Sequence, residues 1–183
     1  MNPLKRLIRW RIAAFERRHD YDMGYAREIL DSSMQALIRF NRITGFTKYR
    51  QDVPLEAWYA AKLVGTLSED CGPCTQLVAG MAEGEGMHPT LIRAVLQGDT
   101  AAMTAETALG FRFAQAALAH DLQADELRGE ILRRWGGKAL VSLAFALTSA
   151  RIFPTLKYAM GHGHSCVRVR VGGVELPVQA AAA

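Results

Sequence analysis

The tetrapeptide Cys-Gly-Pro-Cys, with Cys71 and Cys74 at its ends, has the residue types and spacing best suited to chemistry in this sequence. Two cysteines three residues apart lie on the same face of a helix, where they can form a small-ring disulfide and reopen it. We expect Asp70 or Ser68 to cap a helix beginning near Cys71, whose thiolate the first-turn N–H groups and the helix dipole would stabilise. Glu69 and Asp70 oppose this stabilisation with negative charge. This reasoning predicts a redox dithiol in which Cys71 attacks and Cys74 resolves.

Two structural interpretations of the cysteine pair compete with redox use. The pair can be half of a zinc site, although the sequence has no second Cys-x-x-Cys and no well-spaced histidine pair to complete four ligands. The two cysteines can also be small buried hydrophobes. A thioredoxin fold is rejected, because the segment before the motif has helical periodicity and no strand–helix alternation surrounds it.

Composition favours one mostly helical domain spanning residues 1–183. Within it we expect basic N-terminal helices over 1–50, a core carrying the cysteine pair over 51–160 and a hairpin over 165–178. Residues 1–50 contain eleven Lys or Arg against five Asp or Glu, so the positive charge is concentrated at the N-terminus. No nucleic-acid recognition motif accompanies it, and no nucleic-acid partner is predicted. The sequence has three cysteines and no signal-peptide pattern. Its apolar run of about twelve residues at 139–150 is too short to span a bilayer and is interpreted as a buried helix. These features predict a cytoplasmic location.

The periodicity predicts a chain of helices followed by a short β-hairpin. We expect a helix near the N-terminus from about 3 to 15, a second over 24–39, a loop over 41–52, and helices over 53–66, 71–82 and 89–97. A helix capped at 99 or 100 should reach about 120. Gly136 and Gly137 should separate a helix over 124–135 from an apolar helix that ends at 159 and bends at Pro154. Alternation with a turn at Gly172 and Gly173 predicts the hairpin.

A helix carrying a carboxylate, then a turn, then a helix opening on Cys-x-x-Cys in an all-helical chain resembles the AhpD-like family. This is the carboxymuconolactone decarboxylase and alkylhydroperoxidase superfamily. The resemblance is firmest over 54–96 and extends to about 160. It implies an all-α, AhpD-like helical bundle that assembles as a homo-oligomer. It also implies reduction of hydroperoxides by the cysteine pair, with Cys74 attacking and Cys71 as its partner. That assignment is the reverse of the helix-dipole assignment, so both orders stay open.

The family's proton relay is a glutamate and a histidine, and here these motif positions hold Tyr59 and Val78. Three residues are candidate replacements for the acid–base groups: Glu56, one helical turn from the motif position, Tyr59 itself, and His88 at the start of the following helix. Each also has an ordinary role as a surface carboxylate, a core tyrosine or a loop histidine. No cofactor is predicted.

The predicted function is thiol–disulfide oxidoreductase, extending to alkylhydroperoxidase activity. An external dithiol would be the reductant, and a hydroperoxide or a disulfide would be the substrate. The alternatives are a non-catalytic oligomeric helical binding protein and a cysteine-independent, decarboxylase-like enzyme acting on a small lactone or acid.

Two further features of the sequence are the C-terminal histidines and the basic N-terminal helix. His162, His164 and Cys166 alternate, but a helix C-terminus explains the histidines better than a metal site does. The basic N-terminal helix, with Trp10 as a candidate interfacial anchor, is expected to pack on the domain or on a second subunit rather than on an anionic membrane.

Overall fold

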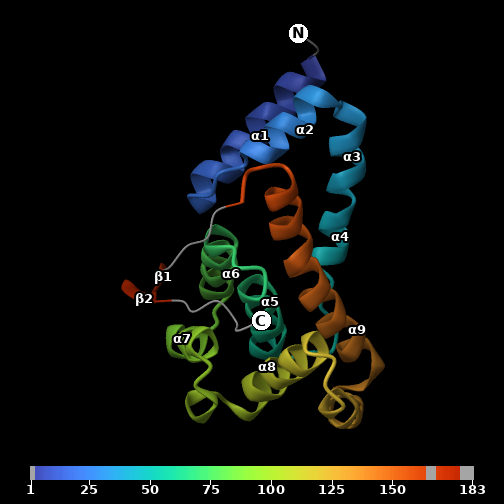
Figure 1. Cartoon of the computed structure of the whole chain (residues 1–183), viewed down its shortest axis with the longest axis vertical. Helices are drawn as coiled ribbons and strands as arrows, with labels where there is room; N and C mark the ends of the chain where they lie inside the picture. The colour runs from blue at the N-terminus through green and yellow to red at the C-terminus, as the bar shows by residue number, and fades with distance from the viewer. Residues whose placement is uncertain (1–2, 164–167, 178–183) are drawn as a thin grey trace.

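The computed structural model describes residues 3–163 and 168–177, and it is mostly helical with one two-stranded antiparallel sheet (Figure 1). The elements, in chain order, are α1 (Pro3–His19), α2 (Gly24–Ser32), α3 (Met34–Asn41), α4 (Ile43–Thr47), α5 (Leu55–Leu67), α6 (Gly72–Gly84), α7 (Pro89–Gln97), the 3₁₀ helix η1 (Thr100–Ala102), α8 (Ala105–Leu118), α9 (Gln123–Ala159), β1 (Arg168–Val171) and β2 (Val174–Pro177). The expected all-α architecture with a C-terminal hairpin is confirmed for these residues.

Helix α5 is the centre of the main core and packs chiefly against α8 and α9. Two glycines allow these close approaches. A Cβ on Gly110 of α8 would lie 2.4 Å from the backbone oxygen of Ala57, and a Cβ on Gly65 of α5 would lie 2.9 Å from the backbone oxygen of Leu147. Such distances leave no room for a side chain, so both contacts require glycine. These contacts fix the position of α5 against α8 and α9. Because α5 leads directly into the cysteine motif, they also fix where that motif begins.

A second, smaller cluster of buried residues belongs to α1, α2 and α3. Its large buried side chains from α1, α2 and the segment between these helices are Ile12, Tyr21, Tyr25 and Leu30. Leu77 of α6, together with Leu156 and Met160 at the end of α9, packs against this cluster. The cysteine helix therefore lies where the N-terminal cluster meets the main core.

The N-terminal half differs from the expected element pattern in two places. The helix expected over 24–39 is interrupted at Ser33, whose extended backbone and side-chain oxygen cap α3 by accepting from the Ala36 N–H. The expected loop over 41–52 contains the short helix α4. Phe46 of α4 packs against Phe145 of α9, with ring centroids 4.2 Å apart and ring planes tilted by 50°. This contact joins residues about 100 positions apart, so the local sequence around α4 could not predict it.

Helix α9 contains the glycine break that the sequence predicted. Gly136 has φ 81° and ψ −178°, a conformation restricted to glycine, and it divides α9 into two helical halves. The helix continues through Pro154 to Ala159. By length and composition α9 is long and apolar enough to cross a membrane, a test that the core helix of a soluble protein also passes. Its apolar residues Ala139, Leu143 and Ala146 are buried in the main core.

The hairpin packs on the cysteine helix. Gly172 and Gly173 both have positive φ, as a tight two-residue hairpin turn requires. Val169 and Val171 of β1 are buried in the main core. The Gln76 side chain of α6 donates to the Arg170 carbonyl oxygen at 3.0 Å and accepts from the Arg170 N–H at 2.7 Å. The Gln76 amide thus pairs with the backbone N–H and C=O of Arg170, as a neighbouring strand would, and it fixes β1 to α6.

Candidate functional site

Cys71 and Cys74 are joined as a disulfide at the start of α6, with their Cα atoms 5.3 Å apart. Cys71 itself is the N-cap residue, with the extended backbone typical of that position, so the expectation that Asp70 or Ser68 caps the helix is wrong. Asp70 instead adopts a left-handed conformation with φ 48° in the turn from α5. The Tyr158 hydroxyl donates to the Asp70 carbonyl oxygen at 2.8 Å and holds this turn against α9.

The disulfide is shielded from solvent. Cys71 is 1% exposed and Cys74 is 4% exposed. Their position nevertheless favours a thiolate in the reduced state, because the first N–H groups of a helix lack intrahelical acceptors and carry the positive end of the helix dipole. The structure thus combines burial, which disfavours a thiolate, with a helix N-terminus, which favours it.

The negative charge of Glu69, expected to oppose a thiolate, is compensated by α9. Arg151 forms an ion pair with the Glu69 carboxylate through its Nε, and the Thr155 hydroxyl donates to the other carboxylate oxygen at 3.0 Å. The Glu69 side chain is 15% exposed, so this pair is partly shielded from water. The repulsion that the sequence suggested is therefore reduced to that of the exposed Asp70 carboxylate.

Tyr21 is the residue that contacts the disulfide from the N-terminal cluster. Its hydroxyl lies 3.6 Å from the Cys74 sulfur, within hydrogen-bonding distance for sulfur. On its other side, the Lys157 ammonium of α9 donates to the same hydroxyl at 3.4 Å and lies 4.6 Å from the tyrosine ring centroid. Lys157 is 2% exposed. The Lys157 ammonium thus contacts the Tyr21 hydroxyl, which in turn contacts the Cys74 sulfur. The three residues come from separate parts of the chain: α9, the segment between α1 and α2, and α6.

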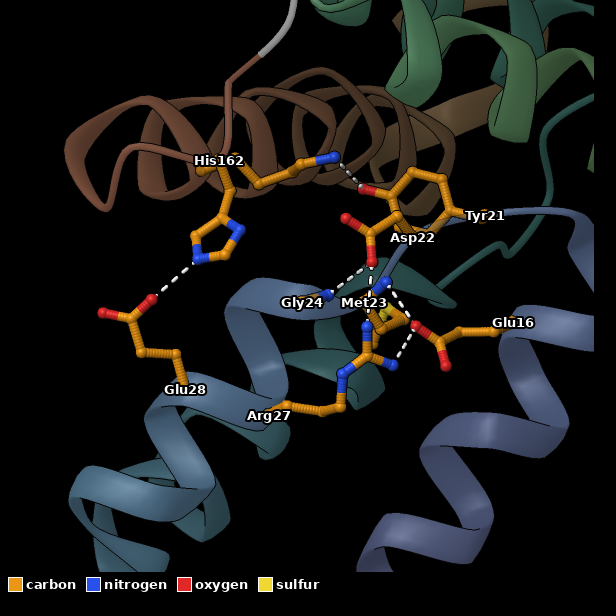
Figure 2. A network of polar contacts seen from close by, with 9 residues as sticks. Glu16, Tyr21, Asp22, Met23, Gly24, Arg27, Glu28 and His162 are labelled. Carbon is orange, nitrogen blue, oxygen red and sulfur yellow. Dashed lines mark hydrogen bonds and ion pairs between the residues drawn. The ribbon is translucent and has the colours of Figure 1, made fainter.

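A network of polar contacts fixes the segment that carries Tyr21 between α1 and α2 (Figure 2). Asp22 accepts from the Gly24 N–H at 2.9 Å and from Arg27 at 3.1 Å. Glu16 of α1 accepts from the Met23 N–H at 2.8 Å and pairs with the same Arg27 guanidinium. Because these contacts join both helices to the segment, the Tyr21 hydroxyl is held in position beside Cys74.

Burial changes the proton affinities of this pair in opposite directions. Loss of solvent raises the pKa of the Tyr21 hydroxyl well above its usual value, with the neighbouring Tyr25 and Asp22 contributing in the same direction. Loss of solvent lowers the pKa of the Lys157 ammonium, and the Asp22 carboxylate opposes that shift. Tyr21 therefore stays protonated as a hydrogen-bond donor, while Lys157 releases a proton more readily than an exposed lysine does.

The acid–base candidates from the sequence make other contacts. The Tyr59 hydroxyl donates to Glu85 at 2.7 Å, and Glu85 also pairs with Arg50. His88 is exposed and caps α7, where its Nδ1 accepts from the Thr90 N–H. Glu56 is half-buried in the first turn of α5. Among the hydrogen bonds of residues 3–163 and 168–177, none joins Glu56, Tyr59 or His88 to either cysteine.

Sequence reasoning missed Tyr21 and Lys157. The sequence contained an indication for Lys157, because it is a lysine within a largely apolar stretch of α9. In the structure this position faces inward. The sequence contained no such indication for Tyr21, because it sits between two helices in a short polar segment. The two residues are 136 positions apart, so their pairing was not visible in local patterns.

Of the alternating residues His162, His164 and Cys166, which the sequence analysis did not favour as a metal site, only His162 lies in the described part of the chain. His162 hydrogen-bonds Glu28 of α2 at 2.7 Å, whereas His164 and Cys166 lie outside the described residues. The described part of the chain contains no group of three or more His, Cys, Asp or Glu side chains that could hold a metal ion.

Two of the cavities in the described part of the chain border residues that position the disulfide, and neither is lined by Cys71 or Cys74. One, of about 660 Å³, lies between α8 and α9 and includes Arg151 and Thr155, which hold Glu69. The other, of about 700 Å³, is bordered by residues 17–20 just before Tyr21, by Gln76 and Leu77 of α6, and by the hairpin. The disulfide is therefore enclosed, with Tyr21 in contact with Cys74.

Comparisons with protein-family models, with curated proteins and with solved structures find no match to this chain.

Proposed function

We propose that this chain is a dithiol oxidoreductase that reduces small hydroperoxides through Cys71 and Cys74. The observation that carries the proposal is the disulfide at the N-terminus of α6 with the Tyr21 hydroxyl at 3.6 Å from Cys74. A helix N-terminus favours the thiolate that such chemistry needs, and a protonated phenol beside the sulfur supplies a hydrogen-bond donor. The resemblance to the AhpD-like family, with its Cys-x-x-Cys in an all-α domain, points to the same chemistry.

Tyr21 favours Cys74 as the attacking thiol. In the reduced protein, the Cys74 thiolate attacks the distal oxygen of a hydroperoxide, which breaks the O–O bond and gives a Cys74 sulfenic acid and an alkoxide. Tyr21 passes a proton to the alkoxide, which leaves as an alcohol, and Lys157 replaces that proton. The Cys71 thiol then attacks the sulfenic sulfur, which releases water and forms the disulfide. An external dithiol returns the pair to the reduced state and is itself oxidised to a disulfide.

Burial favours a small substrate. Cys71 and Cys74 are almost fully enclosed, so a folded partner protein would reach their sulfurs only after local opening, whereas a small hydroperoxide needs a much smaller displacement. The Tyr21–Lys157 pair takes the place of the glutamate–histidine relay of the family that the motif resembles. Assembly as a homo-oligomer, the external dithiol and a cytoplasmic location remain predictions.

The test is a single-turnover oxidation. Dithiothreitol-reduced protein, freed of reductant, is mixed with cumene hydroperoxide, and thiols are counted with time. We expect two thiols to be lost for each hydroperoxide consumed. Cys74→Ser should abolish the reaction, and Cys71→Ser should stop at a sulfenic acid that dimedone traps. Cys166→Ser is the matched control and should react as the parent does.

The redox potential gives an independent measurement. A working pair should equilibrate with glutathione buffers at a potential of roughly −300 to −120 mV, the range of thiol–disulfide enzymes, whereas structural disulfides have potentials below about −300 mV. A reduced protein that forms no disulfide with hydroperoxides or with glutathione disulfide would show that the pair is structural, and the proposal would be wrong.

A further inference from the structure

Helix α1 has apolar side chains on two opposite faces. Ile8, Ile12 and Phe15 face inward and pack in the N-terminal cluster. On the outward face, Leu7 is 53% exposed and Trp10 is 62% exposed. These two residues are three positions apart and lie one turn above the other on the helix surface. The inward stripe is accounted for by the fold, and the outward stripe is not.

Arginines flank the outward stripe on both sides. With 3.6 residues per turn, Arg6 and Arg17 lie along one side of the Leu7–Trp10 line, and Arg11 and Arg18 lie along the other. All four are exposed, and the ion pairs found in the described part of the chain involve none of them.

The acidic residue of α1 does not compensate this charge. Glu16 belongs to the inward side, where it pairs with Arg27 and accepts from the Met23 N–H (Figure 2). The outward face therefore presents a narrow apolar line between two rows of guanidinium groups. Figure 1 places this helix at the N-terminal end of the molecule, beyond the core built around α5.

We propose that the outward face of α1, defined by Leu7, Trp10, Arg6, Arg11, Arg17 and Arg18, docks on an anionic lipid surface. A tryptophan and a leucine between cationic side chains suit the boundary between lipid headgroups and acyl chains, since the apolar groups enter the boundary and the arginines extend to the phosphates. The inference uses none of the residues to which the dithiol proposal gives a role and stands independently of that proposal.

Charge argues against the other occupants. A second copy of this face would bring like-charged arginine rows together, which is unfavourable without an acidic partner surface. A nucleic acid would use the arginines but would leave the exposed Leu7–Trp10 line without a role. An anionic bilayer would bind both the arginines and the Leu7–Trp10 line. The packing that the sequence predicted for this helix then applies to its inward face alone.

The effect of each arginine follows from the surface potential of anionic lipids. A basic residue near such a membrane contributes a factor of about five in binding, corresponding to ~1 kcal/mol. Replacing two arginines should weaken vesicle binding by about 25-fold, and raising the salt concentration should weaken it further.

The experiment is co-sedimentation of the full chain with vesicles of phosphatidylcholine alone or mixed with phosphatidylglycerol. We expect binding to the mixed vesicles at low salt and much less to phosphatidylcholine. Arg11→Gln/Arg18→Gln should lose about 25-fold and Leu7→Ala/Trp10→Ala should lose most binding. Leu122→Ala removes an apolar side chain that is 85% exposed at the start of α9, and this control should bind as the parent does.

Brominated lipid gives a second readout that does not depend on affinity. Trp58 is 4% exposed and Trp135 is half-buried, so Trp10 is the tryptophan that lipid bromine should quench. The quenched component should disappear in Trp10→Phe. Absence of vesicle binding at low salt, equal binding to neutral vesicles or undiminished binding of the Leu7/Trp10 variant would each overturn the proposal. A Trp10-dependent dimer without lipid binding would assign this face to a second copy instead.

Discussion

Replacing Tyr21 with phenylalanine tests whether its hydroxyl stabilises the Cys74 thiolate. The hydroxyl lies 3.6 Å from the sulfur and is itself hydrogen-bonded by Lys157, so its loss removes the donor that contacts Cys74. A hydrogen bond to a charged acceptor contributes about 1.5–3 kcal/mol, and a sulfur acceptor at this distance belongs at the low end. At 1.36 kcal/mol per unit, the pKa of Cys74 should rise by about one unit.

The rate effect should be smaller than the pKa effect and should change sign with pH. Below both pKa values, Tyr21→Phe has about tenfold less thiolate, but a thiolate of higher pKa is about threefold more nucleophilic when the Brønsted coefficient is about 0.5. The variant should therefore react about threefold more slowly at low pH and about threefold faster at high pH. The two pH–rate curves should cross, which a purely structural defect would not produce.

The assay measures Cys74 alone. In a Cys71→Ser/Cys166→Ser background, stopped-flow reaction with 4,4′-dithiodipyridine is followed over a range of pH, and the Cys74 pKa is taken from the rate profile. Tyr25→Phe is the matched control, because Tyr25 is also buried and also near Lys157, with the ammonium 5.9 Å from the centroid of its ring. Burial raises the pKa of Tyr25 to about 12, so neither tyrosine should ionise in the assay range.

An unchanged Cys74 pKa in Tyr21→Phe would refute the reasoning. So would an equal rise in Tyr25→Phe, since that result would trace the effect to packing of the N-terminal cluster rather than to the hydroxyl beside the sulfur. Circular dichroism of both variants checks that the helices are retained.

Two further predictions concern stability. Burial lowers the pKa of Lys62 from 10.5 to about 8, so the unfolded chain binds more protons between these pH values and the free energy of unfolding should rise with pH, by up to about 3 kcal/mol. Urea titrations from pH 7.5 to 9.5 should show this contribution vanish in Lys62→Met but persist in Lys48→Met, an exposed control; parallel curves for both variants would contradict the assignment. Gly136→Ala should destabilise by about 2 kcal/mol because φ is 81°, whereas Gly137→Ala, with open space at its Cβ, should be neutral or stabilising by up to about 1 kcal/mol. Thermal unfolding compares the two alanine variants, and equal melting temperatures would show that the Gly136 conformation carries no such constraint.

Local patterns identified several elements well. Helix α7 has the expected bounds, because Pro89 starts it with a fixed φ and Gly98 ends it in a left-handed conformation. The hairpin turn at Gly172 and Gly173 and the break at Gly136 follow from the same property, the access of glycine to positive φ. Each of these signals is contained within a few consecutive residues.

Elements that depend on distant contacts were predicted less well. Helix α4 is only five residues long and has no capping side chain, and it packs on α9 through Phe46. The identity of the cap before α6 was also misjudged. The left-handed turn at Asp70, held by Tyr158 of α9, places Cys71 at the cap position, and the sequence around the cysteines does not contain that contact.

The sequence by itself determined that a Cys-x-x-Cys pair begins a helix in an all-α chain, because the spacing and the Gly-Pro insert are local properties. Only the tertiary structure decided what surrounds the pair. Tyr21 reaches Cys74, and Lys157 reaches Tyr21, because the N-terminal cluster packs against α6 and the end of α9. The hydrogen-bond partners and burial that tune a thiol depend on residues distant in the chain, and burial of apolar surface brings those residues together.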